Sequence, residues 1–246
     1  MTGWLDSLRA VLDDSEVPVR FFFRDDDAGW ADDALERLLD VFEPYGAPLD
    51  VAAIPEAVTP RTVALLTARA SSGRNDLAVH QHGLAHVNHE PEGRKCEFGV
   101  SRSVAEQTAD IAAGRELLGS KLEDLAPVFT PPWNRCAPWT AEVLHDLGVA
   151  ILSRDLSAGT AGVPGLLELP VSVDWFAKRR KVPVDRTGRG DLLAEMARGS
   201  EPVGVMLHHE VMDDQDLADV GALLRLLAGH PTVSLAHLDQ WALSDA

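Results

Sequence analysis

Residues 19–30 read VRFFFRDDDAGW, an apolar run that leads directly into three consecutive aspartates and a glycine turn. The run predicts a β-strand, and three adjacent carboxylates after it repel one another. A solvated acidic turn or a helix N-cap is the plain interpretation, since aspartate favours both. In barrels and open α/β sheets, however, the carboxyl ends of strands carry active sites, and a cation is the usual reason to crowd carboxylates there. The stretch therefore predicts a strand that ends in a functional site.

The rest of the chain repeats this alternation of short apolar runs with amphipathic segments, which is typical of βαβ units. Seven or eight mostly parallel strands with interleaved helices in 246 residues predict an α/β barrel or barrel-like sheet. No repeat or Ser/Gly-rich linker divides the sequence, so we interpret residues 1–246 as a single catalytic domain. The predicted strands are 19–24, 49–54, 77–81, 128–130, 149–153, 167–171, 203–207 and 232–236. The predicted helices are 32–42, 61–70, 103–118, 141–147, 191–198 and 216–227, and residues 157–165 and 178–190 are predicted surface loops.

Composition narrows the possible partners. The formal net charge is −17, from 22 Lys and Arg against 39 Asp and Glu. Phosphate backbones and anionic headgroups repel so acidic a chain, which argues against nucleic acid and membrane surfaces as partners. The two cysteines, Cys96 and Cys136, form no CxxC pair, and the acidic N-terminal stretch lacks the pattern of a signal peptide. These features predict a cytoplasmic protein with free thiols.

Histidines are concentrated in one short window. Four of the nine lie within residues 80–89, where the motif HGLAH spaces His82 and His86 four residues apart. In a helical turn that spacing points both imidazoles the same way, so that two neutral nitrogens can bind one metal ion. An HxxxH pair alone is more often two unrelated polar residues, so the motif needs support from elsewhere in the chain.

Three further polar clusters follow predicted strands. In FTPPWNR, two prolines fix a loop that either forms a structural turn or holds the following backbone amides toward an oxyanion. VSVDWF and VGVMLHHE each end an apolar run with polar or aromatic residues. The candidate residues in these clusters are Trp133, Asn134, Asp174, Trp175 and His208.

The five clusters together resemble the motifs of the polysaccharide deacetylases, carbohydrate esterase family four, over about residues 19–210. The resemblance implies a distorted (β/α) barrel. It also implies hydrolysis of an N-acetyl amide, on a sugar or sugar conjugate, by one divalent metal ion of the zinc type, with cobalt, nickel and manganese as alternatives. The matching elements are Asp26-Asp27, His82-Gly-Leu-Ala-His86, Pro131-Pro132-Trp133, Asp174-Trp175 and Leu207-His208.

The same resemblance makes Asp27, His82 and His86 the metal ligands and Asp26 the general base. The glycine turn after the aspartates sets this register. A shift by one residue, with Asp25 as the base and Asp26 as the ligand, satisfies the same spacing.

Two other roles follow from the resemblance. His208 would protonate the leaving amine, and the backbone amide of Trp133 would help to hold the oxyanion. Thr130 stands where the proline loop of the family usually begins with an arginine, so another cation is needed to keep the base ionised. Arg24 leaves an extended strand on the same face as Asp26, whereas Arg135 lies just beyond the proline loop. The predicted substrate-binding residues are Trp133, Asn134, Asp174, Trp175 and Arg24.

Some alternatives remain open on the sequence alone. The same barrel can hydrolyse a non-sugar linear or cyclic amide, and a metal-free carbohydrate-binding protein can retain the groove without turnover. The tryptophans near the motifs are either platforms for a sugar ring or core residues, and Arg24 is either a support for the base or a surface ion pair. The predicted location favours a small molecule or oligosaccharide over a wall polymer, and the oligomeric state is not predicted.

Overall fold

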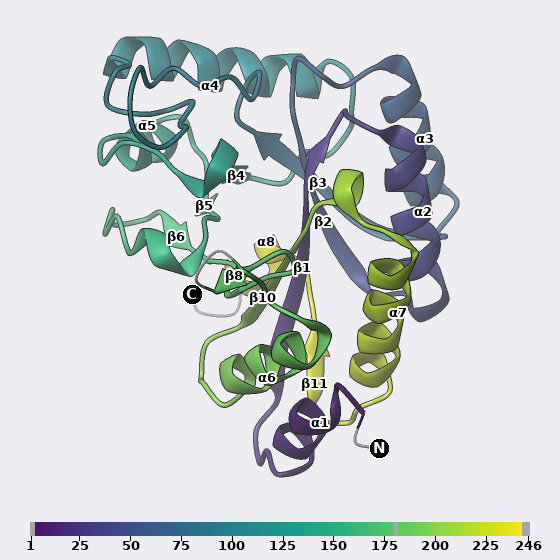
Figure 1. Cartoon of the computed structure of the whole chain (residues 1–246). Coiled ribbons are helices and arrows are strands. Elements are labelled where there is room, and N and C mark those ends of the chain that lie inside the picture. The colour runs from purple at the N-terminus through teal and green to yellow at the C-terminus, as the bar shows by residue number, and fades with distance from the viewer. Residues whose placement is uncertain (1–2, 180–181, 243–246) are drawn as a thin grey trace.

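The computed structural model describes residues 3–179 and 182–242, which form a curled parallel sheet flanked by helices (Figure 1). Every pairing within this sheet is parallel. The strands are β1 (Val19–Ala28), β2 (Pro48–Ala53), β3 (Asp76–His82), β4 (Val128–Thr130), β5 (Ile151–Leu152), β6 (Leu167–Glu168), β7 (Val173–Asp174), β10 (Val203–Leu207) and β11 (Val233–Leu235).

The sheet runs in the order β6-β5-β4-β3-β2-β1-β10-β7, and β11 pairs with the first residues of β1. No ladder joins β6 to β7 in the part of the chain that the structure describes, although one bridge, between Asp155 and Val171, lies at this opening. The sheet is therefore a half-barrel that curls without closing. The distorted (β/α) barrel expected from the motifs is confirmed.

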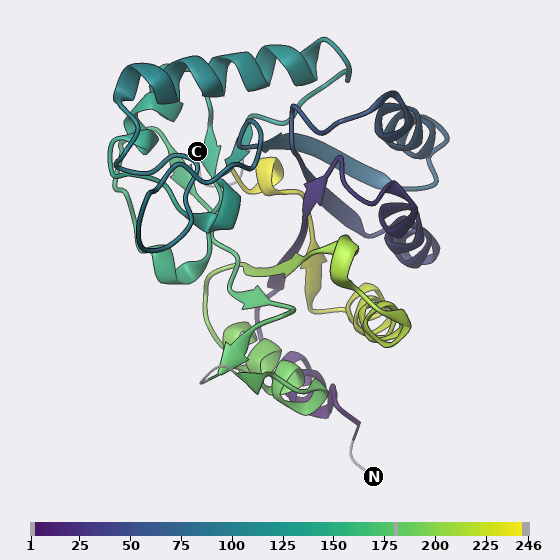
Figure 2. The ribbon, with the colours of Figure 1, turned by 45° about the horizontal axis from the view of Figure 1, so that its top comes forward.

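Helices cover the outside of the sheet. Figure 2 shows α2, α3 and α7 end-on along one side, while α1 packs against α6 at the amino end of β1 and α4 packs on α5. No helix within residues 3–179 and 182–242 is long and apolar enough to cross a bilayer. The helices are α1 (Asp6–Asp13), α2 (Asp32–Phe42), α3 (Pro60–Ser71), α4 (Val104–Gly119), α5 (Thr140–Asp146), α6 (Arg186–Ala197), α7 (Asp214–Ala228) and α8 (Leu238–Ala242).

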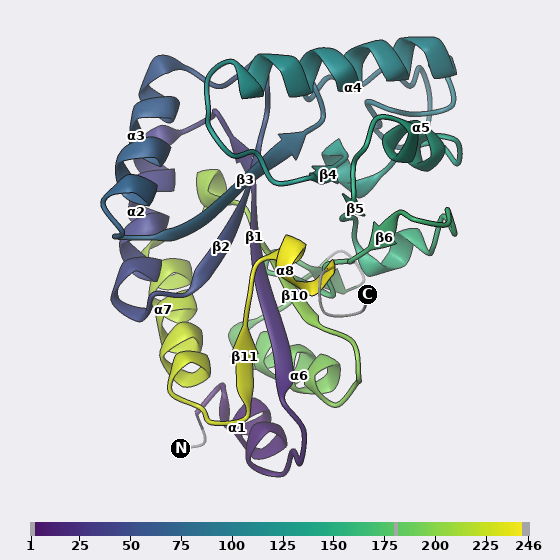
Figure 3. The same ribbon diagram turned by 180° about the vertical axis from the view of Figure 1, so that it is seen from behind.

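The apolar run that opened the sequence is buried on both faces. Phe21 and Phe23 point outward into the core beneath the helices, and Phe22 points inward into a second core within the barrel. Trp241 of α8 closes this inner core, and α8 lies beside β5 behind the sheet (Figure 3). A strand covered on both faces needs no polar alternation, which explains the continuous run. The alternation continues into the aspartates and decides which of them faces the barrel interior.

The segment after β7 differs from the prediction. The predicted loop 178–190 contains a short antiparallel pair, β8 (Lys178–Arg179) with β9 (Val182–Pro183), and the first residues of α6. Asp185 caps α6 by accepting from the Gly188 N–H. The glycines and charges of 186–190 concealed this helix start, because packing against α1 stabilises it rather than intrinsic propensity. Residues 180–181 lie outside the described ranges.

Candidate metal and catalytic site

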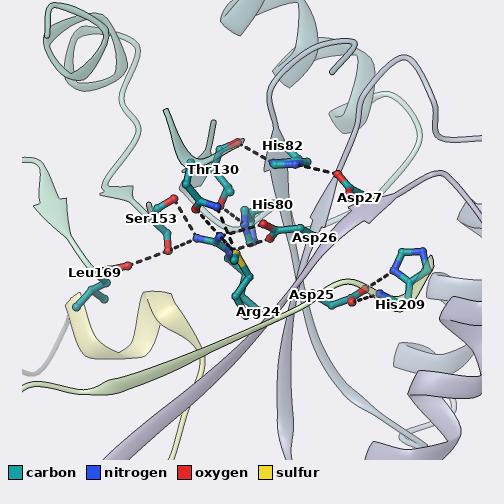
Figure 4. A network of polar contacts seen from close by, with 12 residues as sticks. Arg24, Asp25, Asp26, Asp27, His80, His82, Thr130, Ser153, Leu169 and His209 are labelled. Atoms are coloured by element: carbon teal, nitrogen blue, oxygen red, sulfur yellow. Dashed lines mark hydrogen bonds and ion pairs between the residues drawn. The ribbon is translucent and has the colours of Figure 1, made fainter. Parts of the chain in front are cut away.

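Polar side chains gather where the carboxyl ends of β1, β3, β4 and β10 meet at one edge of the sheet (Figure 4). The three aspartates of β1 separate there. Asp26 contacts Arg24 inside the barrel, Asp27 faces His82, and Asp25 contacts His209 on the other side of the strand. Three adjacent like charges are thus held apart by being given three different partners.

A bulge aims Asp27 at the site. Strict alternation along β1 would place Asp27 on the same face as Asp25. The register between β1 and β2 shifts between Asp25 and Ala28, and Asp27 has a left-handed φ of 72°. Bulges of this kind bend a strand and redirect its side chains. The carboxylate of Asp27 consequently turns toward the end of β3.

Asp27, His82 and His86 each offer one ligand atom, and these atoms lie within 4.8 Å of one another. Asp27 Oδ1 is 3.2 Å from His82 Nε2 and 3.3 Å from His86 Nε2. The side chains are only 14%, 2% and 11% exposed, respectively. One carboxylate and two imidazoles that converge on one point are the ligand set of a catalytic zinc site, which uses three protein ligands and leaves the fourth position to water or substrate.

The hydrogen bonds of His82 fit a cation at this point. Its Nδ1 lies 2.9 Å from the carbonyl oxygen of Thr130, and because a carbonyl only accepts, Nδ1 carries the proton. The lone pair of Nε2 in the neutral ring therefore faces the Asp27 carboxylate, which requires a positive charge between them. Burial lowers the pKa of His82, yet the hydrogen bond to Asp27 and the charges of Asp26 and Asp27 raise it overall. A divalent ion satisfies the same geometry, with Thr130 fixing the ring tautomer.

The HGLAH motif is not a helical turn, which corrects the geometry expected from its spacing. His82 ends β3, and the residues after it form a loop in which Gly83 and His86 have positive φ values of 61° and 57°. A Cβ at Gly83 would lie 2.1 Å from the Glu97 carboxylate, so only glycine fits there. Glu97 is buried and accepts the N–H groups of Leu84 and Ala85, which shapes the loop that presents His86.

Arg24 holds Asp26 in a two-point ion pair. Nε lies 2.8 Å from Oδ1 and Nη2 lies 2.9 Å from Oδ2, with the Arg24 side chain fully buried. Burial raises the pKa of Asp26, but Arg24 outweighs it, with help from His82 and His208, and lowers that pKa to about 2. Arg24 also donates to the carbonyl and hydroxyl of Ser153. Arg24, and not Arg135, therefore contacts the candidate base. Because Arg24 is fully buried, it forms neither a surface ion pair nor part of the substrate-binding surface.

Replacing Arg24 with glutamine is expected to move the acid limb of the pH–rate profile upward by about one to three units, because the Asp26 carboxylate loses its counterion. The lowered pKa keeps Asp26 ionised even at pH values below its ordinary titration range, and this ionisation is lost as the pH falls through about 2. Arg24→Lys keeps the positive charge but loses the two-point contact of the guanidinium, so it should shift the acid limb of the pH–rate profile less. Arg135→Gln is the matched control and should leave the limb in place. An unmoved limb in Arg24→Gln, with metal content intact, would contradict this role.

Two further predicted substrate-binding residues, Trp175 and Asn134, are both buried, although Asn134 still lines a groove. Trp175 is 1% exposed, and its indole N–H donates to Asp216 while the Arg189 guanidinium stacks 4.6 Å from the ring. It supports the helices and forms no groove wall, which corrects that prediction. The side chain of Asn134 is directed into the protein, where its Oδ1 accepts from Arg24 Nη2 at 2.7 Å.

The proline loop places Trp133 against the triad. The Trp133 and His86 rings are 4.4 Å apart, and Trp30 packs edge-on to His86 from the other side. Trp133 and Asn134 both have left-handed φ values, of 56° and 57°, and such strain is typical of functional sites. The Asn134 N–H donates to the Pro131 carbonyl, so of the two predicted oxyanion donors only the Trp133 amide stays a candidate.

His208 and Asp174 lie on a groove beside Trp133 that has a volume of about 750 Å³. Burial raises the pKa of the Asp174 carboxyl, and the neighbouring His208 counteracts this. His208 also acts electrostatically on Asp26, so the two side chains lie near one another. Asp174 accepts the Phe176 N–H, which fixes its orientation.

Asp25, the base of the alternative register, forms a buried pair behind the site with His209, for which the sequence predicted no role. His209 Nδ1 lies 2.7 Å from Asp25 Oδ2, its backbone N–H donates to Oδ1, and its Nε2 donates to the Trp30 carbonyl. Neither side chain of the pair is exposed. Burial lowers the pKa of His209, but Asp25 outweighs it and raises that pKa to about 9. The sequence signals for this pair were the extra aspartate before Asp26 and Asp27 and the second histidine of LHH.

Asp25→Asn is expected to lower the free energy of unfolding at pH 7 by about 3–5 kcal/mol, because it leaves a buried imidazolium without its counterion. The raised pKa of His209 means that the contribution of the pair is complete below about pH 6.5 and is lost as the pH rises through about 9. Denaturant unfolding from pH 6 to 10 should show the gap between the variant and the parent protein closing. Asp13→Asn, at the exposed partner of His230, is the control and should change little. A gap that persists at pH 10 would contradict the ion pair.

Structural comparison identifies the fold, although no family model matches the sequence and the curated proteins contain no match to it. The structure is similar to that of a polysaccharide deacetylase candidate from Mycobacterium smegmatis, at 15% identity and a TM-score of 0.70, over 94% of this chain and 91% of that one. A family 4 carbohydrate esterase from Streptomyces lividans in complex with acetate matches at 13% identity and a TM-score of 0.59, over 89% of this chain and 93% of the esterase. A family 4 acetyl xylan esterase from Clostridium thermocellum in complex with a cobalt ion matches at 13% identity and a TM-score of 0.52, over 84% of this chain and 80% of the esterase. The chain has the polysaccharide deacetylase fold, and the fold expected from the motifs is confirmed.

Proposed function

We propose that this protein is a metal-dependent hydrolase that removes the acetyl group from the nitrogen of an acetylated sugar or sugar conjugate, with residues 1–246 acting as one catalytic domain. The observation that carries the proposal is the convergence of Asp27, His82 and His86 beside an ionised Asp26. Similar structures that contain acetate or cobalt support it.

Asp27, His82 and His86 would hold one divalent ion, with zinc as the first choice and cobalt, nickel or manganese as alternatives. Such an ion, when bound, polarises the amide carbonyl and acidifies a water molecule. The ring of Trp133 packs on His86 beside the triad and also lines the neighbouring groove. Trp133 therefore bounds the space in which the acetyl group would lie.

The remaining steps fall to the residues of the chain. An amide is a weak electrophile with a poor leaving group, so its hydrolysis needs a base for the attacking water and an acid for the departing amine. Asp26, held ionised by Arg24, accepts the proton of the water. His208, on the groove side, donates a proton to the amine nitrogen, and it lies close enough to Asp174 to act on that carboxylate electrostatically. The Trp133 N–H donates to the oxygen that becomes negative.

A substrate panel tests the proposal. Purified protein would be loaded separately with zinc, cobalt, nickel and manganese. It would be assayed for acetate release from N-acetylglucosamine and chitooligosaccharides, and for ammonia release from acetamide and a cyclic ureide. We expect acetate release that requires metal and is lost on chelation. Ammonia from the simple or cyclic amides alone would favour a non-sugar amidase, and tight sugar binding with no product would favour a carbohydrate-binding protein.

A further inference from the structure

Basic side chains without carboxylate partners surround the groove that leads away from the candidate site. Arg94, Arg135 and Lys178 line it together with Trp133 and His208. Lys95 lies over the outer side of the Trp133 ring, with its Nζ 5.7 Å from the ring centroid. These cations come from segments far apart in the sequence, so only the fold places them round one cavity.

The basic side chains of the described residues fall into two groups, those with a carboxylate within 4 Å and those without one. Acidic residues outnumber basic ones by 39 to 22 in the whole sequence. Arg37, Arg61 and Arg74 each contact a carboxylate elsewhere on the surface. Within residues 3–179 and 182–242, by contrast, no carboxylate oxygen lies within 4 Å of Arg94, Lys95, Arg135 or Lys178.

The two guanidinium groups at this groove also act on each other. Burial lowers the pKa of Arg135, and the charge of Arg94 lowers it further, while Asp155 opposes the shift. One Nη1–H of Arg135 is used by the Lys95 carbonyl, at 3.1 Å. Two neighbouring cations with unused donors form a site that an anionic group would stabilise.

The two acidic residues of the groove are engaged elsewhere. Asp155 accepts the backbone N–H and the hydroxyl of Ser157 within its own turn. Asp174 accepts the Phe176 N–H and lies beside His208. Asp155 acts on Arg135 electrostatically, but neither carboxylate lies within 4 Å of Arg94 or Arg135 in the described residues, so both cations remain available to a bound molecule.

The groove adjoins the metal triad at Trp133, which lines the groove and whose ring contacts His86. A substrate whose acetamide lies at the triad therefore extends the rest of its body along Trp133 toward Arg94 and Arg135. We propose that this part of the substrate carries an anionic group, a carboxylate or a phosphate, that binds Arg94 and Arg135 with Lys95 and Lys178 at the rim. The inference rests on the proposed function, since it names the substrate class of the same site.

Matched substrates test the inference. N-acetylglucosamine 6-phosphate and N-acetylmuramic acid would be compared with neutral N-acetylglucosamine in the metal-loaded protein. At least one of the two anionic compounds should show a kcat/KM about tenfold or more above the neutral one, mainly through a lower KM, and the advantage should shrink as salt is raised. The phosphate and carboxylate arms distinguish the two sources of charge.

Variants locate the effect. Arg94→Gln and Arg135→Gln should each reduce the ratio of anionic to neutral kcat/KM by about tenfold. Arg225→Gln is the matched control, because Arg225 is also exposed without a carboxylate partner in the described residues but lines a different cavity. It should leave the ratio unchanged. Equal kcat/KM values for the anionic and neutral compounds in the parent protein would overturn the inference. A loss of the ratio in the Arg225 variant as large as in the Arg94 and Arg135 variants would also overturn it.

A binding measurement separates this inference from the proposed function. Calorimetry with glucosamine 6-phosphate and with glucosamine needs no turnover. Tighter binding of the phosphate that is lost in Arg94→Gln, without hydrolysis of any acetamide, would support the anion site and contradict the deacetylase proposal. Hydrolysis of neutral acetamides, with no preference for the anionic compounds in rate or binding, would contradict the anion site and leave the deacetylase proposal standing.

Discussion

The His82→Ala, His86→Ala double variant is expected to bind no divalent metal and to release no acetate above the uncatalysed background. Two of the three ligand atoms that lie within 4.8 Å of one another are removed, and a single carboxylate at Asp27 is too weak a site to retain an ion. Elemental analysis after dialysis would measure the metal, which should fall from about one ion per chain to none. Metal uptake by the parent protein should also weaken toward acid pH, because the raised pKa of His82 means that protons compete with the ion there.

His89→Ala is the matched control for the double variant. His89 belongs to the same histidine-rich segment, but it is exposed, and the contact that fixes it is a backbone hydrogen bond to Cys96. Metal content and rate should both stay near those of the parent protein. Full metal occupancy in the double variant would place the metal elsewhere and remove the basis of the proposed function.

Asp26→Asn is expected to lower kcat by a factor of about 10²–10⁴ while metal binding is retained, since the base is lost and the ligands are not. Asp27→Asn should show the other pattern, with metal lost first and activity following from that loss. The structure gives this expectation its direction, because Asp26 bonds to Arg24 and Asp27 faces both histidines. Parallel assays of metal content and rate would distinguish the two variants.

A second variant protects the Asp26 test against a folding artefact. Asn at position 26 leaves the buried guanidinium of Arg24 without a counterion, which itself destabilises the protein. The Asp26→Asn, Arg24→Gln double variant removes both charges and should regain stability without regaining turnover. Loss of metal in Asp26→Asn with retention in Asp27→Asn would instead mean that the base and the ligand are exchanged.

The sequence determined the class of fold and the general position of the site. Apolar runs alternate with amphipathic segments over the whole chain. A strand with helices packed on its outer side must bury its apolar residues, so this pattern does not depend on the details of packing. Polar clusters that follow such runs must meet at the carboxyl edge of a parallel sheet. The two-residue spacing of Arg24 and Asp26 on an extended strand likewise required only the alternation of side chains, and the structure shows that contact.

Only the tertiary structure decided how the individual residues are used. The direction of the Asp27 side chain depends on a bulge against β2, and the position of His86 depends on a loop held by Glu97. Neither the bulge nor the loop has a local signature in the sequence. Trp175 is a core residue because Trp4, α6 and α7 pack around it, and the pairing of Asp25 with His209 joins positions 184 residues apart. Local patterns report which face of an element is buried. The partner of a side chain across the fold depends on contacts between distant segments, which periodicity does not encode.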